Sequence, residues 1–137
     1  MTVPAQDELI KAFITTVSGV AGLTNRVYDT LSPEIGTIGA KTFPYAVVTN
    51  IGETINGNNS TWLGPYPQML LQIDLYCDVS LGITSARLKN DAIFNVLDRQ
   101  YIDTNKGFVR CNTIGTQFQD SYRILIISQY MIQVTTN

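Results

Sequence analysis

The chain has 137 residues and a mass of 15.2 kDa, so we expect residues 1–137 to form one domain with its own hydrophobic core. Only 15% of the residues are charged, against about 25% in typical soluble domains. Low charge suits a protein that hides surface in contacts with other proteins, although compositional drift would give the same figure. The net charge is -2, and the nine Lys and Arg residues are scattered singly, which argues against a dedicated nucleic-acid-binding protein.

The first half of the chain predicts one helix and two strands. Apolar residues recur at helical spacing after Asp7: Leu9, Ile10, Phe13, Ile14 and Val17. Residues 26–28 are expected to form a short strand, and residues 32–42 form a loop punctuated by Pro and Gly. The segment 44–51, which a proline opens, reads as the next strand. A long stretch of turn residues at 52–65 follows it.

The second half predicts two strands on either side of a helix, and then a final strand at 122–134. Residues 69–77 alternate strictly, and their expected inward side chains are Met69, Leu71, Ile73, Leu75 and Cys77. A helix is expected from Ser80 or Thr84 to about Arg99. Its apolar positions are Ile83, Ala86, Leu88, Ala92, Ile93, Val96 and Leu97. With a strand at 108–114, this order predicts an α+β fold: a mostly antiparallel four- to five-stranded sheet with two helices packed on one face.

The final strand is the most informative segment. Without Gly or Pro to interrupt it, it would extend over roughly 40 Å at ~3.3 Å per residue, about twice the usual strand. One face would carry Tyr122, Ile124, Ile126, Ser128, Tyr130, Ile132 and Val134, and the other would carry Arg123, Leu125, Ile127, Gln129, Met131 and Gln133. A small domain can hardly cover both faces along this length, so we expect another protein chain to cover the remainder. Tyr130 is a candidate interface residue.

Residues for catalysis or metal binding are scarce. The chain has no histidine, which excludes Ser/His/Asp and Cys/His catalysis and removes the commonest metal ligand. Asp74 and Asp78 would share a face if their strand continued, but a solvated strand end explains them better. Residues 36–42 resemble a phosphate-binding loop only faintly, because Lys41 does not directly follow the last glycine. We therefore expect no enzyme, no cofactor and no metal.

Compartment and redox state follow from similar observations. The N-terminus does not resemble a signal peptide, and no segment approaches the ~20 apolar residues of a membrane helix, so we expect a protein made and used, or assembled, in a cytosol. Cys77 and Cys111 lack partners at metal-ligand spacing. Reduced, partly buried thiols are the expected state, and a disulfide between them is the alternative.

The loop at 52–65 is expected to be a contact arm for a partner protein. Its Gly and Asn residues give the backbone freedom, and it lacks the apolar periodicity of a core element. Trp62, the single tryptophan, either covers an edge of the core or anchors a partner. The candidate interface residues of this region are Asn56, Asn58, Trp62, Leu63 and Tyr66.

Three segments, in order, carry a family resemblance. They are Arg26-Val27-Tyr28-Asp29, Phe43-Pro44-Tyr45-Ala46-Val47-Val48 and Leu71-Gln72-Ile73-Asp74-Leu75-Tyr76. With the helix and terminal strand that follow, this pattern resembles the tail completion proteins of tailed phages, which are also called tail terminators or tail-to-head joining proteins. The resemblance spans Leu9 to Val134, and the order and spacing of the segments carry most of its weight.

The resemblance implies an α+β subunit that forms a ring, typically of six copies. Such a ring is a structural part of the virion, is assembled in the host cytoplasm and lies at the head-proximal end of the tail. It terminates the tube, contacts the tail tube protein on one side and the neck or connector of the head on the other, and carries no catalytic residues. Two alternatives remain open: another virion part, such as a neck adaptor or tube-initiating protein, and a small cytosolic binding module.

Overall fold

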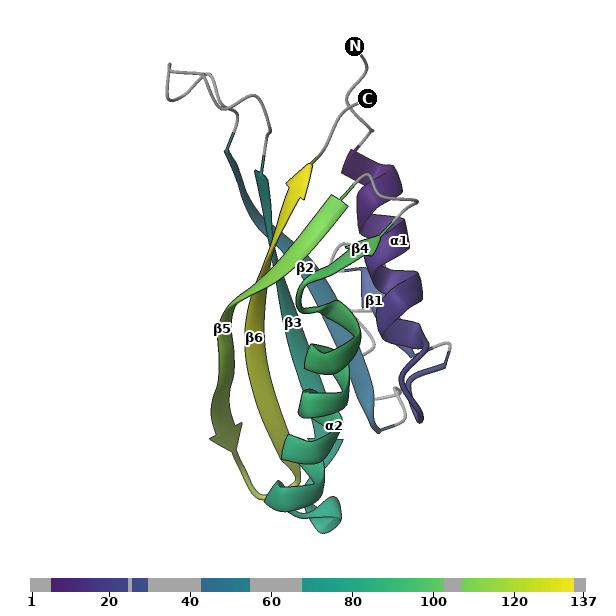
Figure 1. Ribbon diagram of the computed structural model, residues 1–137. Helices are drawn as coiled ribbons and strands as arrows, with labels where there is room; N and C mark the ends of the chain where they lie inside the picture. Colours follow the sequence, from purple (N-terminus) through teal and green to yellow (C-terminus); the bar gives the residue numbers. More distant parts are fainter. Residues whose placement is uncertain (1–5, 25, 30–42, 55–67, 103–106, 135–137) are drawn as a thin grey trace.

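The computed structural model describes residues 6–24, 26–29, 43–54, 68–102 and 107–134, and it shows an α+β fold. Two α-helices lie on one side of a 6-stranded sheet (Figure 1). In chain order the elements are α1 (Gln6–Ser18), β1 (Val27–Asp29), β2 (Tyr45–Thr54), β3 (Gln68–Asp78), the 3-10 helix η3 (Val79–Leu81), α2 (Ile83–Leu97), β4 (Gln100–Ile102), β5 (Gly107–Gln119) and β6 (Arg123–Val134). No helix in these ranges is long and apolar enough to cross a membrane.

The sheet has the strand order β1-β2-β3-β6-β5-β4. Its pairs are antiparallel except for β1 and β2, which run parallel. The expected fold class and the two helices are confirmed, but the sheet is mixed and has six strands rather than four or five. The parallel pair is possible because the chain between Asp29 and Tyr45 is long enough for a crossover of a dozen residues. The unexpected strand β4 has only three residues, too few to show a period-2 pattern.

The core lies between the helices and one face of the sheet. All five expected inward residues of β3 are buried, and so are alternate residues of β6 from Ile124 to Ile132. From α1, Leu9, Phe13 and Val17 enter the same cluster. The alternation predicted for both central strands is therefore confirmed, and it sets which side chains remain on the sheet face without helices.

Helix α2 differs from the prediction in its boundaries and in its buried face. It begins after Gly82, whose φ of 89° favours glycine, and Ser80 lies in η3, where its N–H donates to the carboxylate of Asp78. The buried positions are Ala86, Asn90, Ile93 and Leu97. Leu88 and Val96, which the pattern placed on the apolar side, are 64% and 37% exposed. Asn90 takes a core position because Ser128 of β6 offers it a hydrogen-bond partner.

Strand β5 runs past its predicted end at residue 114 to Gln119. Its pairing with β6 shifts register between Cys111 and Thr113 and again between Thr113 and Thr116. Gly115, with a φ of 83°, lies in the second irregularity, and its N–H donates to the Ser128 hydroxyl at 3.1 Å. The strand end expected at residue 114 is wrong because Gly115 forms a bulge here and not a turn.

Candidate protein–protein interface

Of the six predicted interface residues, only Tyr130 lies within the described residues, and its position contradicts the prediction. Asn56, Asn58, Trp62, Leu63 and Tyr66 lie outside the described residues, so the contact arm stays a prediction. Tyr130 is 0% exposed and packs in the core, with its ring 6.1 Å from that of Phe13. The interface assignment of Tyr130 is wrong because β6 turns this residue toward α1. The Tyr130 hydroxyl is buried without a hydrogen-bond partner in the described part of the chain.

Replacing Tyr130 by Phe should raise the free energy of unfolding by about 1 kcal/mol. The substitution keeps the packed ring and removes a hydroxyl whose unpaired burial costs about 1–3 kcal/mol. Chemical denaturation of both proteins measures the difference. Tyr101→Phe is the matched control, because Tyr101 is 56% exposed and its change should stay within about 0.5 kcal/mol. A clear loss of stability in Tyr130→Phe would show that the hydroxyl has a partner.

The second face of the central strands, which we call the open face, carries no helix (Figure 1). Here β6 and β3 present alternate, half-buried residues in register: Arg123, Leu125, Ile127, Gln129, Met131 and Gln133 from β6, and Gln68, Leu70, Gln72, Asp74 and Tyr76 from β3. This face mixes aliphatic, amide and charged side chains. The composition is closer to that of a protein–protein interface than to that of a domain core.

A chain of side-chain hydrogen bonds crosses the open face from β5 to β3. The Asn112 amide donates to Gln129 at 3.4 Å, Gln129 donates to Gln72 at 3.3 Å, and Gln72 donates to the Asp74 carboxylate at 2.8 Å. Burial raises the pKa of the Asp74 carboxyl above its ordinary value, and the hydrogen bond from Gln72 opposes this change. The carboxylate of Asp74 is thus held in place by Gln72 but is poorly hydrated.

Replacing Asp74 by Asn should raise the melting temperature at pH 7. The folded-state pKa is raised, so the ionised carboxylate destabilises the fold at neutral pH, and this cost disappears as the pH falls through the folded-state pKa toward 3.8. The asparagine oxygen can still accept the hydrogen bond from Gln72. The advantage of the variant should therefore be largest at pH 7 and shrink toward pH 4, as thermal melting across this range would measure. A variant less stable than the wild type at pH 7 contradicts the assignment.

An aromatic cluster closes one end of the open face. Tyr45 stacks on Tyr76 with ring centroids 4.8 Å apart, and Tyr28 packs edge-on against Tyr45 at 6.0 Å. Phe43 also stacks on Tyr45, with ring centroids 5.7 Å apart. Burial, joined by the nearby Tyr76 hydroxyl, raises the pKa of Tyr45 to about 12. The cluster gathers one or more aromatic residues from each of the three segments that carry the family resemblance.

The turn between β5 and β6 continues the cluster to the surface. The guanidinium of Arg123 lies 5.4 Å from the ring centroid of Tyr76 and 5.5 Å from that of Tyr122. Asp120 shapes the turn: its carboxylate accepts from the N–H groups of Tyr122 and Arg123 and from the Arg123 side chain at 3.2 Å. The hydrogen bond from the backbone N–H of Tyr122 contributes most to lowering the pKa of Asp120, and the bonds from Arg123 add to it.

Three of the exposed large apolar side chains lie along β5 and the turn that follows it, and we call them the hairpin patch. Ile114 lies beside Arg87 and Asn90 of α2, whereas Phe118 is in register with Leu125 of the open face. Ile114, Phe118 and Tyr122 are 47%, 54% and 57% exposed. Exposed aromatic residues beside an arginine are the composition of energetically important interface sites. Ile114 and Phe118 were not among the interface residues expected from the sequence. The available signal was two aromatic residues, Phe118 and Tyr122, in the otherwise polar stretch 115–122.

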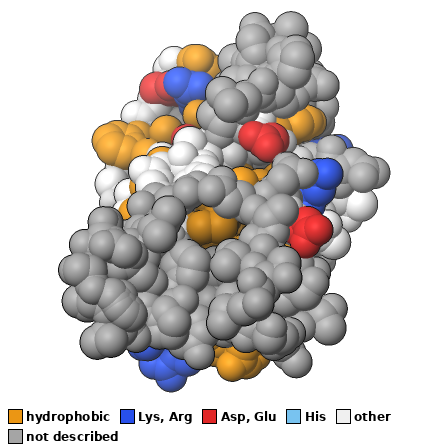
Figure 2. Space-filling view, turned by 90° about the horizontal axis from the view of Figure 1, so that it is seen from above, with side chains coloured by type: hydrophobic (Ala, Val, Ile, Leu, Met, Phe, Trp, Pro, Cys, Tyr) orange, Lys and Arg blue, Asp and Glu red, His pale blue; other side chains and the backbone are white. Residues whose placement is uncertain are grey.

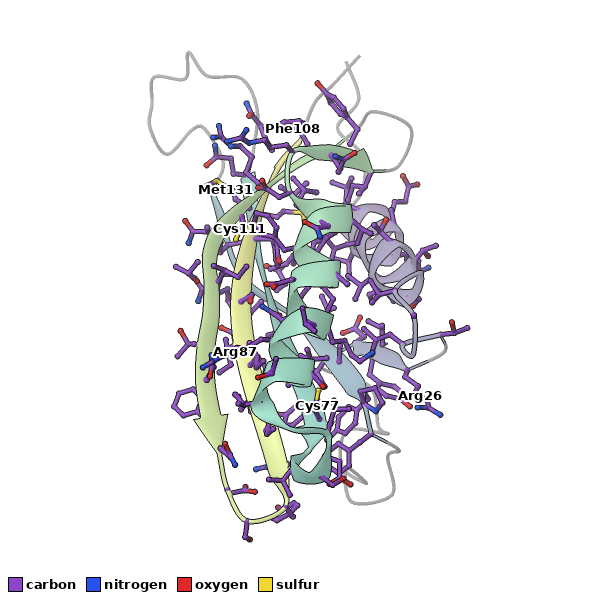
Figure 3. The ribbon with its side chains drawn as sticks, turned by 60° about the horizontal axis from the view of Figure 1, so that its bottom comes forward. Arg26, Cys77, Arg87, Phe108, Cys111 and Met131 are labelled. Carbon is purple, nitrogen blue, oxygen red and sulfur yellow. The ribbon has the colours of Figure 1, made fainter. Side chains whose placement is uncertain are left out.

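At the opposite end of the open face two shallow depressions share the residues Gln68 and Met131. One has a volume of about 290 Å³ and also touches Phe108, Arg110 and Cys111; the other has about 230 Å³. Figure 3 shows Phe108, Cys111 and Met131 close to one another at this end. In the described ranges, no three or more Cys, Asp or Glu side chains gather where they could hold a metal ion.

Both cysteines are free thiols, as the sequence analysis expected. Cys77 of β3 pairs with Ile124 of β6, and Cys111 of β5 pairs with Tyr130 on the other edge of β6, six residues further along that strand. The distance between their Cα atoms is therefore far greater than the ~7 Å that a disulfide tolerates. Burial raises the pKa of Cys77 to about 11 and also raises that of Cys111, so neither thiol has the properties of a nucleophile.

In the view of Figure 2 the visible Lys, Arg, Asp and Glu side chains are scattered, and neither sign forms a patch. Among the described residues the ion pairs are local: Arg99 with Asp98, and Arg123 with Asp120. The open face and the hairpin patch carry mainly uncharged side chains, with Arg123 and Asp74 as the charged residues of the open face.

No protein-family model and no curated protein sequence matches the chain. Among solved structures, the fold is similar to that of a chain in the "Virion of native gene transfer agent (GTA) particle". The similarity covers 91% of this chain and 94% of that chain, with a TM-score of 0.60 and 14% sequence identity. The chain thus shares its fold, over nearly the whole length of both proteins, with a component of a virion particle.

Proposed function

We propose that this protein is a structural subunit of a phage-type virion, and that it forms a ring at the head-proximal end of the tail. The ring ends the tail tube and joins it to the neck or connector of the head. The observation that carries the proposal is the similarity in fold, along nearly the full length of both chains, to a component of a gene transfer agent virion. The family resemblance of the sequence supports the more specific position in the particle.

Two features of the subunit support a role in assembly. The segments that resemble the tail completion proteins form adjacent strands, β1, β2 and β3, and their aromatic residues pack into one cluster. The open face and the hairpin patch together offer exposed apolar and aromatic side chains to which neighbouring subunits can bind.

Electron microscopy of a lysate from a phage that lacks the gene tests the proposed position. Heads should fill with DNA, tails should remain unjoined, and tubes should grow past their normal length because nothing ends them. Expression of the intact gene from a plasmid is the control and should restore joined particles. Normal-length tails attached to heads would rule the proposal out.

The same experiment separates the alternative virion roles. A neck adaptor would leave tails of normal length next to unjoined heads, whereas a tube-initiating protein would leave no tubes at all. Native mass spectrometry of the purified protein, or of tails carrying it, should show a discrete ring, for which we expect six copies. A single copy per particle would contradict the ring.

A further inference from the structure

The outer edge of β5 is covered at one end and open at the other. Strand β4 pairs with Gly107–Val109, and the N–H of Arg99 donates to the Val109 carbonyl at 2.7 Å. The Asp98 carboxylate then accepts the N–H of Cys111 at 2.8 Å. Beyond this point, no strand among the described residues lies against the outer side of 112–119, as the lower left of Figure 1 shows.

This open stretch lacks the usual protection of an edge strand. Residues 112–119 contain no charged residue and no proline, although the irregularity at Gly115 bends the strand. Past the bend, Thr116–Gln119 pairs regularly with β6 again. The exposed Ile114 and Phe118 lie within the stretch, and Arg87 of α2 reaches it through a hydrogen bond to the Gln117 side chain at 3.2 Å (Figure 3). A regular, uncharged edge of this kind is a template for another strand.

The far side of the sheet has the complementary arrangement. Strand β1 pairs with Ala46–Val48 at the beginning of β2, and no described strand lies outside the last four residues, 51–54. The two three-residue strands, β1 and β4, thus cover diagonally opposite corners of the sheet. In a repeated arrangement, β2 of one copy would run antiparallel to β5 of the next, because β2 and β5 have opposite directions within the sheet.

The offset between the open stretches fits a closed ring of strands. Through the register, Glu53 lies level with Ile132 of β6 and Gln117 lies level with Ile126, six positions away. Six positions correspond to about 20 Å, and the repeat of four strands from β2 to β5 is about 19 Å wide. Joining the stretches therefore tilts the strands by about 45°, close to the ~35–45° that closure of a sheet into a barrel requires.

We propose that copies of this chain join edge to edge, with residues 51–54 of one copy pairing antiparallel with residues 116–119 of the next. This inference rests on the proposed ring and names the surface that closes it. The contact is head-to-tail, so it uses two different edges and leaves none open when the ring is complete. In this arrangement β1 and β4 occupy the corners that the tilted neighbours do not reach.

Disulfide trapping tests the contact directly. Gly52→Cys and Phe118→Cys are combined in a background of Cys77→Ala and Cys111→Ser. A Cβ at Gly52 meets nothing within 4 Å, and Phe118 is exposed, so both cysteines are tolerated. Antiparallel pairing of the two stretches sets position 52 opposite position 118 of the neighbour. Within one subunit these positions are three strands and six register positions apart, roughly 25 Å, so a disulfide can form only between copies.

Mild oxidation, of the concentrated protein and of tails that carry it, should give a ladder of covalent oligomers that ends at the ring size. Gly52→Cys combined with Leu88→Cys is the matched control, because Leu88 is exposed on α2 and belongs to neither edge strand. This control should give no ladder. Ladders of equal yield from both pairs, or no ladder from the 52/118 pair in either sample, would overturn the edge contact.

A second variant tests the contact without cross-linking. Thr116→Lys with Phe118→Lys puts charge on the open edge and should shift the assembled protein to monomer in native mass spectrometry, with the melting temperature of the monomer kept. Leu88→Lys with Val96→Lys adds the same charge on α2 and should leave assembly intact. A ring that persists in the edge variant overturns the edge contact but leaves the proposed ring standing. A monomer in the wild type, in solution and on tails, contradicts both.

Discussion

Phe13→Ala should lower the free energy of unfolding by about 3–5 kcal/mol, the usual cost of removing a large buried aromatic side chain. Phe13 is fully buried at the centre of α1, and its ring lies 6.1 Å from that of Tyr130. The substitution removes contacts with the sheet and leaves a cavity between α1 and β6. A domain of this size has about 5–15 kcal/mol of stability in total, so a large share of it would be lost.

Chemical denaturation measures this effect, and two further variants keep the result interpretable. Phe13→Leu should cost clearly less than Phe13→Ala, because most of the apolar volume stays, and it serves if the alanine variant does not fold. Leu88→Ala removes an apolar side chain that is 64% exposed on α2 and should change stability by no more than about 0.5 kcal/mol. Equal effects for Phe13→Ala and Leu88→Ala would show that α1 does not hold the sheet.

The central part of the fold was predictable from the sequence because local periodicity and burial agree there. In β3 and β6, buried and half-buried residues alternate strictly, and the buried ones face the helices. The boundaries of both strands fall within one residue of those expected. The first helix was predictable for the same reason. The short strand expected at 26–28 is confirmed as β1, one residue further along the chain, whereas the three-residue strand β4 is too short to show a period and was not expected.

The errors in the candidate site and in α2 arise where contacts between distant segments, and not the local pattern, decide how a residue is placed. Tyr130 belongs to a strand with large side chains on both faces, and the sequence does not tell which face the helices will cover. Phe118 was overlooked because Gly115 made its segment look like a loop after the strand expected at 108–114, whereas the glycine allows β5 to bend and continue. Asn90 breaks the apolar pattern of α2 because a polar group on a distant strand satisfies it.

Ser128→Ala should lower the free energy of unfolding by about 2–3 kcal/mol, an effect out of proportion to the single oxygen atom removed. The Ser128 hydroxyl accepts the N–H of Gly115 at 3.1 Å and lies 3.3 Å from the amide nitrogen of Asn90, which is itself buried. Without this hydroxyl, the buried Asn90 amide and the Gly115 N–H both lose a hydrogen-bond partner. A buried polar group that is left without a partner costs about 1–3 kcal/mol.

A double variant shows whether the loss comes from unpaired polar groups. Asn90→Leu combined with Ser128→Ala replaces both partners by apolar groups of similar size, so it should recover much of the stability that Ser128→Ala loses. Ser85→Ala, on the exposed side of α2, is the matched control and should change stability by no more than about 0.5 kcal/mol. Hydrogen exchange at the Gly115 amide should accelerate in Ser128→Ala, because this bond holds the bend of β5 against β6. If Ser128→Ala is as stable as the wild type and exchange at Gly115 is unchanged, the bend of β5 does not depend on this hydroxyl.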